Sequence, residues 1–194
     1  MSIPEESTLV SSSDFFVDDM QVVNFGPGSK SRGVVDISAV SKYLIVSVLH
    51  SSEDSPHERV IYTAVNATQC NKAHFPHDKP STFSSAHYLV DDATRSLVIN
   101  IQPSPAKEIG TFFTSDLTGR YFVESLKNTH FSYGLLDFME LPGVQGVRLL
   151  NQIQNAREIE AGWGARKLKT VITRDDGSSW DVLNAPERDM DGIE

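Results

Sequence analysis

The feature that most constrains this chain is a succession of short apolar segments separated by clusters of Gly, Pro, Asn, Asp and Ser. In one of them Leu97, Ile99 and Ile101 share a face, and the residues between them share the other. A period of two is typical of a half-buried β-strand, and many such segments at close spacing predict an all-β sandwich, barrel or propeller. The expected strands are Val34–Val40, Tyr43–His50, Arg59–Val65, Ser96–Gln102, Thr111–Ser115, Tyr121–Leu126, Leu135–Leu141, Gly146–Gln152, Lys167–Arg174 and Trp180–Leu183.

The segment 144–162 also carries a helical signal. Its apolar residues recur at roughly helical spacing, and Gly162 is placed to end a helix. A single helix is one interpretation. The other is a strand at Gly146–Gln152 followed by one or two helical turns near Asn155–Glu160. We favour the second, because a β context commonly overrides a short periodic signal.

The most specific motif runs from Thr173 to Trp180. It fits the Asp-box pattern, which is Ser or Thr, any residue, Asp, any residue, Gly, two further residues and an aromatic. Asp175 can accept backbone N–H groups within a tight turn, and Gly177 supplies a positive φ. Because Thr173 ends one strand and Trp180 brings a large ring to the next, we expect the box to fix a β-hairpin against the core.

Two weaker copies of this box lie upstream. Residues 115–122 keep Ser115, Gly119 and Phe122 but have Leu117 where the pattern has Asp, and residues 63–70 keep only Thr63. The copies start at 63, 115 and 173, and a repeat of roughly 40–50 residues with about four strands is typical of propeller blades. The sequence therefore predicts an arc of about three to four β-propeller blades with Asp-box hairpins. The expected limits are 1–26 for a partial blade, then 27–76, 77–130 and 131–186.

Composition excludes several classes of function. With 17 basic and 26 acidic side chains the net charge is −9, which argues against nucleic acid and anionic membranes as partners. No apolar run approaches the roughly 18 residues of a membrane span, so we expect no membrane insertion by this segment. Glu5 and Glu6 stand where a signal peptide would be positively charged. The lone Cys70 cannot form an internal disulfide, so no cross-link framework is expected.

Individual polar residues give no catalytic or metal site. Asp175 and Asp176 lack the following ligands of an EF-hand loop, and His74 and His77 have no companion cluster at ligand spacing. We therefore expect no catalytic residue, no metal and no cofactor. Asn66, in the sequence Asn-Ala-Thr, is a candidate for N-glycosylation if the chain reaches the secretory lumen.

The whole chain resembles the interior of a sortilin-type luminal propeller, in the fungal branch of the vacuolar protein sorting (Vps-ten) receptors. The resemblance rests on segments that occur in the same order along the chain. They are SSDFF at 12–16, the strand pair 34–50, KAHFPHD at 72–78, TSDLTGRYFVESLKNTH at 114–130, LLDFMELPGVQGVRLLN at 135–151 and TVITRDDGSSW at 170–180.

This resemblance implies a normally ten-bladed propeller and a non-catalytic function. Such receptors bind protein or peptide cargo, including soluble vacuolar hydrolases, on the luminal side of Golgi and endosome membranes. About three to four blades are expected here, so the resemblance implies a fragment or truncated form whose partners include the remaining blades. The family's binding residues do not map onto motifs in this sequence, so the cargo-binding residues are unknown.

Two alternatives remain at this stage. One is a stand-alone, non-enzymatic interaction protein or an inactive remnant, which glycosylation at Asn66 would separate from a luminal receptor. The lesser one is a sialidase-like glycoside hydrolase, since those propellers also carry Asp boxes. No arginine here sits in the Arg-Ile-Pro context that opens a sialidase propeller, and a six-bladed ring needs about twice this length.

Overall fold

The structure is a computed structural model that describes residues 7–26, 32–50, 58–65, 69–76, 85–90, 96–104, 108–132 and 135–184. Within these residues the chain is almost entirely antiparallel β-structure, with one short helix, α1 (Ala156–Glu160). The all-β class predicted from the alternating segments is confirmed.

The strands gather into units that follow one another along the chain. β1 (Val10–Ser11) pairs with β2 (Gln21–Val22), and β3 (Val34–Val40), β4 (Tyr43–His50), β5 (Glu58–Val65) and β6 (Asn71–Lys72) form a four-stranded sheet in sequence order. Each strand thus lies beside its neighbour in the chain, as short hairpin connections require.

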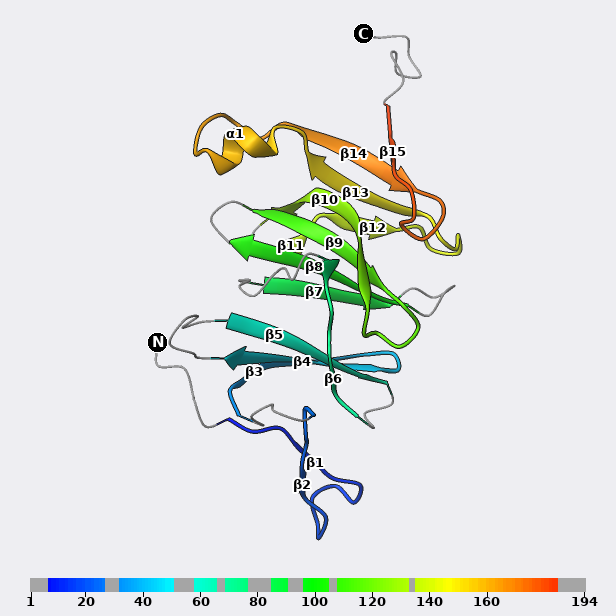
Figure 1. The fold of residues 1–194 in the computed structure, drawn as a ribbon. Coiled ribbons are helices and arrows are strands. Elements are labelled where there is room, and N and C mark those ends of the chain that lie inside the picture. The colour runs from blue at the N-terminus through cyan, green and yellow to red at the C-terminus, as the bar shows by residue number, and fades with distance from the viewer. Residues whose placement is uncertain are drawn as a thin grey trace.

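A larger, nine-stranded sheet contains the rest. It contains β7 (Ser85–Val90), β8 (Leu97–Ser104), β9 (Ile109–Ser115), β10 (Phe122–Ser132), β11 (Leu135–Leu136), β12 (Phe138–Glu140), β13 (Arg148–Ile153), β14 (Leu168–Thr173) and β15 (Asp181–Val182). One paired position, Thr129 with Gln152, joins β10 to β13, so β7–β10 and β12–β15 behave as two units. Figure 1 shows the units stacked one above another, from β1–β2 at the bottom to β15 at the top.

The middle sheets bury apolar residues on both faces. Successive residues of a strand point to opposite faces, so one strand contributes to two core clusters. On β4, Tyr43 and Ile45 enter a core cluster shared with β8, while Val46 and Val48 enter a second cluster on the opposite face with Phe25. This second cluster extends to residues beside β1 and β2 through Leu9 and Val23.

The same alternation continues in β8. Leu97, Ile99 and Ile101 face β4 and β5, whereas Val98 packs on the other side with residues of β9, β13 and β14. Phe112, Leu150 and Val171 complete the buried part of that third cluster. Successive sheets packed face to face in this way, each through its own apolar side chains, form an arc of β-propeller blades.

The sequence located most of the strands. The bounds of β3 and β4 agree with prediction, and residues 144–162 form β13 followed by α1, as we favoured over a single helix. β8 extends two residues beyond the expected end at Gln102, to Ser104, and β9 begins at Ile109, two residues before the expected start at Thr111. The sequence missed four strands, namely β1, β2, β6 and β7.

The blade limits remain a prediction. β3–β6 lie within the interval 27–76 and β12–β15 within 131–186, whereas β10 runs two residues past the expected limit at 130.

Candidate functional site

The turn between β14 and β15 is the segment with the complete Asp box. The Thr173 hydroxyl donates to Asp175 Oδ1 at 2.8 Å and accepts the Gly177 amide at 2.8 Å. Asp175 also accepts the amide and the hydroxyl of Ser179, at 2.8 and 2.6 Å. The two short side chains thereby satisfy backbone donors that the tight turn removes from the strand ladder.

These hydrogen bonds have an electrostatic consequence at Asp175. The bond from the Ser179 hydroxyl, followed by those from the Ser179 amide and the Thr173 hydroxyl, lowers the pKa of the Asp175 carboxyl to about 2, from 3.8. Donors aimed at a carboxylate favour its charged form, so the turn and the ionised side chain stabilise each other.

The same turn is attached to the preceding unit of strands. The hydroxyl of Ser125, on β10, donates to the carbonyl of Gly177 and accepts the Trp180 ring N–H at 3.0 Å. The Trp180 ring also meets Phe112 edge to face, with ring centroids 5.8 Å apart. A shift in the β9–β10 pairing between Glu124 and Leu126 marks a bulge at this place. Bulges redirect side chains, which explains how Ser125 reaches the turn.

The turn between β9 and β10 takes its carboxylate from a residue that the sequence pattern did not identify. Leu117 stands at the expected Asp position, but the carboxylate comes from its neighbour Asp116, which accepts the Thr118 hydroxyl at 2.7 Å and the Arg120 amide at 3.1 Å. Burial alone would raise the pKa of Asp116, but these bonds outweigh it and the pKa is lowered. The Ser115 hydroxyl accepts the amide of Leu97 on β8 at 2.9 Å and donates to the Asp116 carbonyl at 2.7 Å.

Gly119 and Phe122 fix this second turn to its surroundings. Gly119 has φ +69°, and its carbonyl accepts the hydroxyl of Thr63 at 2.7 Å. Phe122 is buried and stacks on Phe75 at a centroid distance of 4.6 Å. Thr63 was expected to begin a decayed box of its own, whereas here it reaches from β5 to the turn of the next unit. The remainder of that expected box includes Asn66, which lies outside the described residues.

A third turn of this kind, between β1 and β2, was missed by the sequence motif. The Ser12 hydroxyl donates to Asp14 Oδ1 at 2.6 Å and accepts the Phe16 amide at 2.7 Å, and Asp14 accepts the Asp18 amide at 2.7 Å. Led by the Ser12 bond, these contacts lower the pKa of Asp14 to about 2. Ser12, Asp14 and Phe16 correspond in order to Thr173, Asp175 and Gly177, so Phe16 stands in the glycine position. Ser12 lies 51 residues before Thr63, so the spacing could have revealed it.

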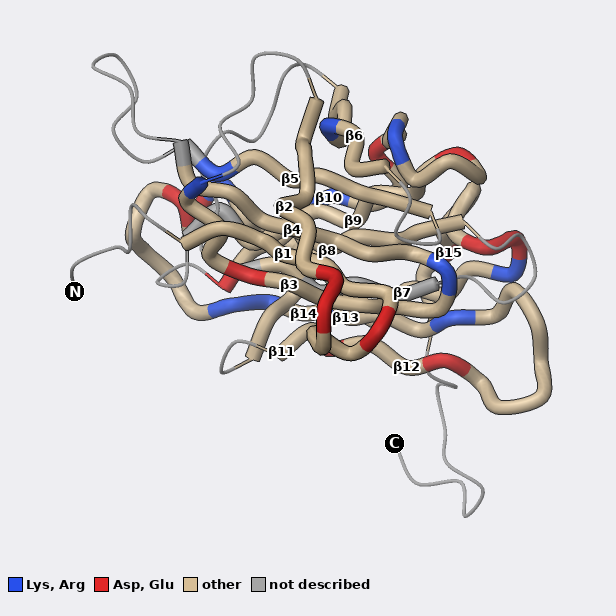
Figure 2. Tube along the Cα trace, turned by 90° about the horizontal axis from the view of Figure 1, so that it is seen from below, with Lys and Arg blue, Asp and Glu red and all other residues tan. Residues whose placement is uncertain are grey.

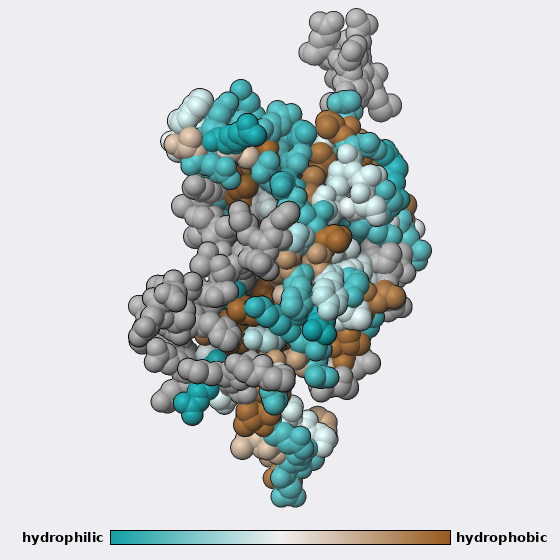
Figure 3. All heavy atoms as spheres, viewed as in Figure 1, coloured by the Kyte–Doolittle hydropathy of each residue, from teal (hydrophilic) through white to brown (hydrophobic). Residues whose placement is uncertain are grey.

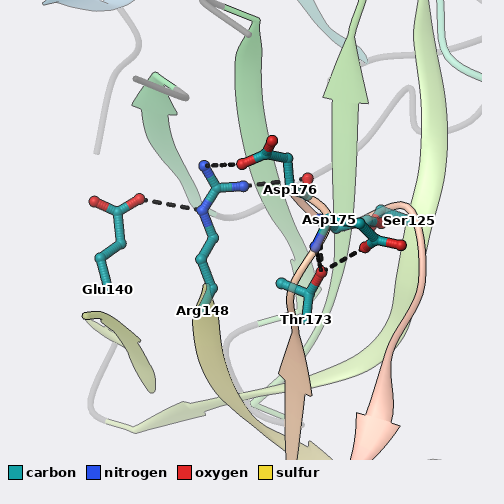
Figure 4. Close-up of polar contacts among 7 residues, drawn as sticks. Ser125, Glu140, Arg148, Thr173, Asp175 and Asp176 are labelled. Atoms are coloured by element: carbon teal, nitrogen blue, oxygen red, sulfur yellow. Dashed lines mark hydrogen bonds and ion pairs between the residues drawn. The ribbon is translucent and has the colours of Figure 1, made fainter. Parts of the chain in front are cut away.

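An ion-pair cluster around a buried arginine lies beside the complete box. The Arg148 side chain is only 5% exposed, and its Nε donates to Glu140 at 3.2 Å while Nη1 donates to the Asp176 carbonyl at 3.2 Å. Figure 4 shows the guanidinium between Glu140 and Asp176. The loop from Glu140 to Arg148 surrounds a hollow of about 400 Å³ here. The contacts of Arg148 thus join the β12–β13 loop to the box. Because two carboxylates face one guanidinium, the net charge of the cluster is negative.

Other candidate residues take no part in a reactive cluster. Cys70 is buried, and burial raises the pKa of its thiol. His74 stacks on Tyr121 at a centroid distance of 5.3 Å, and His77 lies outside the described residues. Among the described residues no group of His, Cys, Asp and Glu could hold a metal ion, and no helix is long and apolar enough to cross a membrane. Lys and Arg lie on several separate segments in Figure 2.

Stacked antiparallel sheets with Asp-box turns define a β-propeller protein. Residues 2–194 match the model of the Sortilin-Vps10 family, described as sortilin, neurotensin receptor 3. The chain therefore belongs to the Sortilin-Vps10 family, which is generally non-enzymatic.

Fungal relatives agree with this assignment. The chain is 39% identical to vacuolar protein sorting/targeting protein 10 of Laccaria bicolor over 96% of its own length and 13% of the relative's. It is 31% identical to the protein of that name from Neurospora crassa, over 93% of this chain and 12% of the relative. Identity to the vacuolar protein sorting/targeting protein PEP1 of Saccharomyces cerevisiae is 28%, over 95% of this chain and 11% of the relative. The chain thus spans about an eighth of the length of the relatives it matches.

Proposed function

We propose that this chain is a non-catalytic, luminal cargo-binding region of a sorting receptor that carries soluble hydrolases from the Golgi to the endosome or vacuole. The observation that carries the proposal is membership of the Sortilin-Vps10 family along nearly the whole chain. The stacked sheets support it, because a rigid β scaffold positions loops for ligand binding. Cargo would bind as extended peptide segments, through backbone hydrogen bonds and shallow pockets.

The proposed function places the chain in a particular compartment and in a longer receptor. The chain would act on the luminal side of Golgi and endosome membranes, as a fragment or truncated form beside further blades. Asn66 could then be N-glycosylated, since the glycan is added only to luminal chains.

The first test is the intact mass of the native protein from its source, with and without glycosidase. We expect a species far above 21.5 kDa that shifts on deglycosylation. An Asn66→Gln variant should lose the mass of one glycan, and Thr68→Ala should do the same while keeping the asparagine. A native species at 21.5 kDa that does not shift would contradict the sorting function.

The second test addresses cargo directly. Deleting the gene should cause a soluble vacuolar protease activity to appear in the culture medium, because unbound cargo would follow the default secretory route. Reintroducing the wild-type gene should restore retention. Retention of the protease in the deletion strain would refute sorting of that cargo and leave the family assignment unaffected.

A further inference from the structure

The β1–β2 turn and the complete box share their backbone geometry but differ at one residue. The amides of Phe16 and Gly177 donate to the corresponding hydroxyls of Ser12 and Thr173, at 2.7 and 2.8 Å. The φ of Phe16 is +65° and that of Gly177 is +91°. Positive φ is ordinary for glycine but a genuine outlier for a bulky side chain, so Phe16 holds an unfavourable conformation.

At the other two turns, a side chain in the glycine position would crowd the preceding unit of strands. A Cβ on Gly177 would lie 3.0 Å from Ser125 Oγ, and one on Gly119 would lie 2.7 Å from Tyr43 Cε1. The carbonyl of each glycine also accepts a hydroxyl from the unit of strands before it: Gly177 from Ser125 on β10, and Gly119 from Thr63 on β5. In two independent turns, therefore, a side chain at the glycine position would point toward the preceding unit of strands.

Phe16 places a benzyl group at the position where a Cβ in those turns would already be in tight contact with the preceding unit of strands. Within the described part of the chain the residue is 59% exposed. Val17 and Met20 on the same hairpin are exposed as well. At the lower end of the molecule, where this hairpin lies, Figure 3 shows apolar atoms beside hydrophilic ones. An exposed apolar group held in a strained conformation by a hydrogen-bonded turn is typical of an interaction site.

We propose that Phe16 docks into an apolar recess of the antiparallel sheet that precedes β1 in the assembled receptor. The recess would have small apolar side chains in place of the rings that Tyr43 and Phe112 present to Gly119 and Gly177, and a hydroxyl donor for the Phe16 carbonyl. The inference rests on the proposed function in one respect, because it needs a receptor longer than this chain. The expected partner of the Phe16 ring is a β-sheet and not cargo or lipid.

Phe15 provides a matched control on the same turn. It is 96% exposed and also has a positive φ, of +60°. Its counterpart Asp176 faces Arg148 of its own unit, so Phe15 is not directed toward a preceding sheet. Removing either ring takes away a similar apolar area, but only Phe16 should lose a docking contact.

Photocrosslinking in the native-length receptor tests the direction of Phe16. We expect Phe16→p-benzoylphenylalanine to crosslink to a strand N-terminal to this chain, with a yield several-fold above that of Phe15→p-benzoylphenylalanine. Equal yields, or crosslinks from position 16 to cargo, to lipid or to residues 7–184, would overturn the proposal. So would a native product of 21.5 kDa, which would hold no preceding sheet.

Thermal unfolding of the same receptor provides a second readout. Phe16→Gly should lower Tm although it relieves the left-handed strain, Phe16→Leu should lower it less, and Phe15→Gly should not lower it. A rise in Tm for Phe16→Gly would show strain without docking and overturn the inference. Cargo sorting is measured separately, so its failure beside a positive crosslink would refute the proposed function and leave the docking contact standing.

Discussion

At the scale of single residues, Asp175 connects hydrogen bonding in the box to pH. The Ser179 hydroxyl is the largest cause of its pKa of about 2, so Ser179→Ala should raise the pKa toward 3.8. Because the folded pKa lies below the unfolded one, the stabilisation is present above about pH 4 and is lost as pH falls toward 2. An NMR titration of the Asp175 carboxyl measures this shift. Ser178→Ala is the control, and a pKa that moves equally in both variants would contradict the assignment.

Gly110 is a residue whose lack of a side chain is required by packing. A Cβ there would lie 2.7 Å from Thr129 Oγ1 and would collide with Phe131. Thr129 and Asn100, both fully buried, bond to each other at 3.0 and 3.1 Å and cannot easily move away. Gly110→Ala should therefore lower the free energy of unfolding by about 1–3 kcal/mol, measured by denaturant titration.

A second substitution tests the cause of that loss. Phe131→Leu removes part of the ring that the new methyl group meets, so the double variant should be more stable than the sum of the two single changes predicts. Strict additivity would show that the Gly110 effect arises elsewhere.

At the scale of elements, hydroxyl groups of one sheet hold the turn of the next. Thr63 is buried and donates to the Gly119 carbonyl, so Thr63→Val should leave that acceptor without its donor. The expected loss is about 1–3 kcal/mol of unfolding free energy, read from the denaturant midpoint.

Thr114 on β9 supplies the matched control for this change. Within the described residues its hydroxyl oxygen is buried and makes no hydrogen bond, so Thr114→Val should be neutral or stabilising. Equal destabilisation by the two Thr→Val changes would rule out the inter-sheet bond as the cause.

The turns also show how far sequence could predict the site. The 173–180 turn was found because its residue types fit the pattern at every position. The pattern found no Asp in the 115–122 turn because Asp116 lies three residues before Gly119 instead of two. It missed the 12–19 turn because Phe16 replaces glycine. A carboxylate and a positive φ define the turn physically, and different residues can supply both. The partners Ser125 and Thr63 lie 52 and 56 residues from the carbonyls they contact, and only the packed sheets bring them together.

At the scale of the whole molecule, stability depends on contacts between successive sheets, because each sheet is too thin to bury its apolar residues alone. Ile99 is fully buried in the cluster that β8 shares with Tyr43 and Ile45 of β4. Ile99→Ala should cost about 2–5 kcal/mol.

The location of that loss distinguishes a cooperative arc from independent sheets. Hydrogen exchange should accelerate in β4 and β5 as well as in β8 and β9, since both sheets lose the same buried contacts. Ile37→Ala, at a position on β3 that is 49% exposed, should change exchange little in either sheet. If the Ile99 variant loses protection only in β7–β10, the sheets unfold separately and the shared core does not couple them. Loss across both sheets would mean that a change in one sheet destabilises the next, because the same side chains form the core of both.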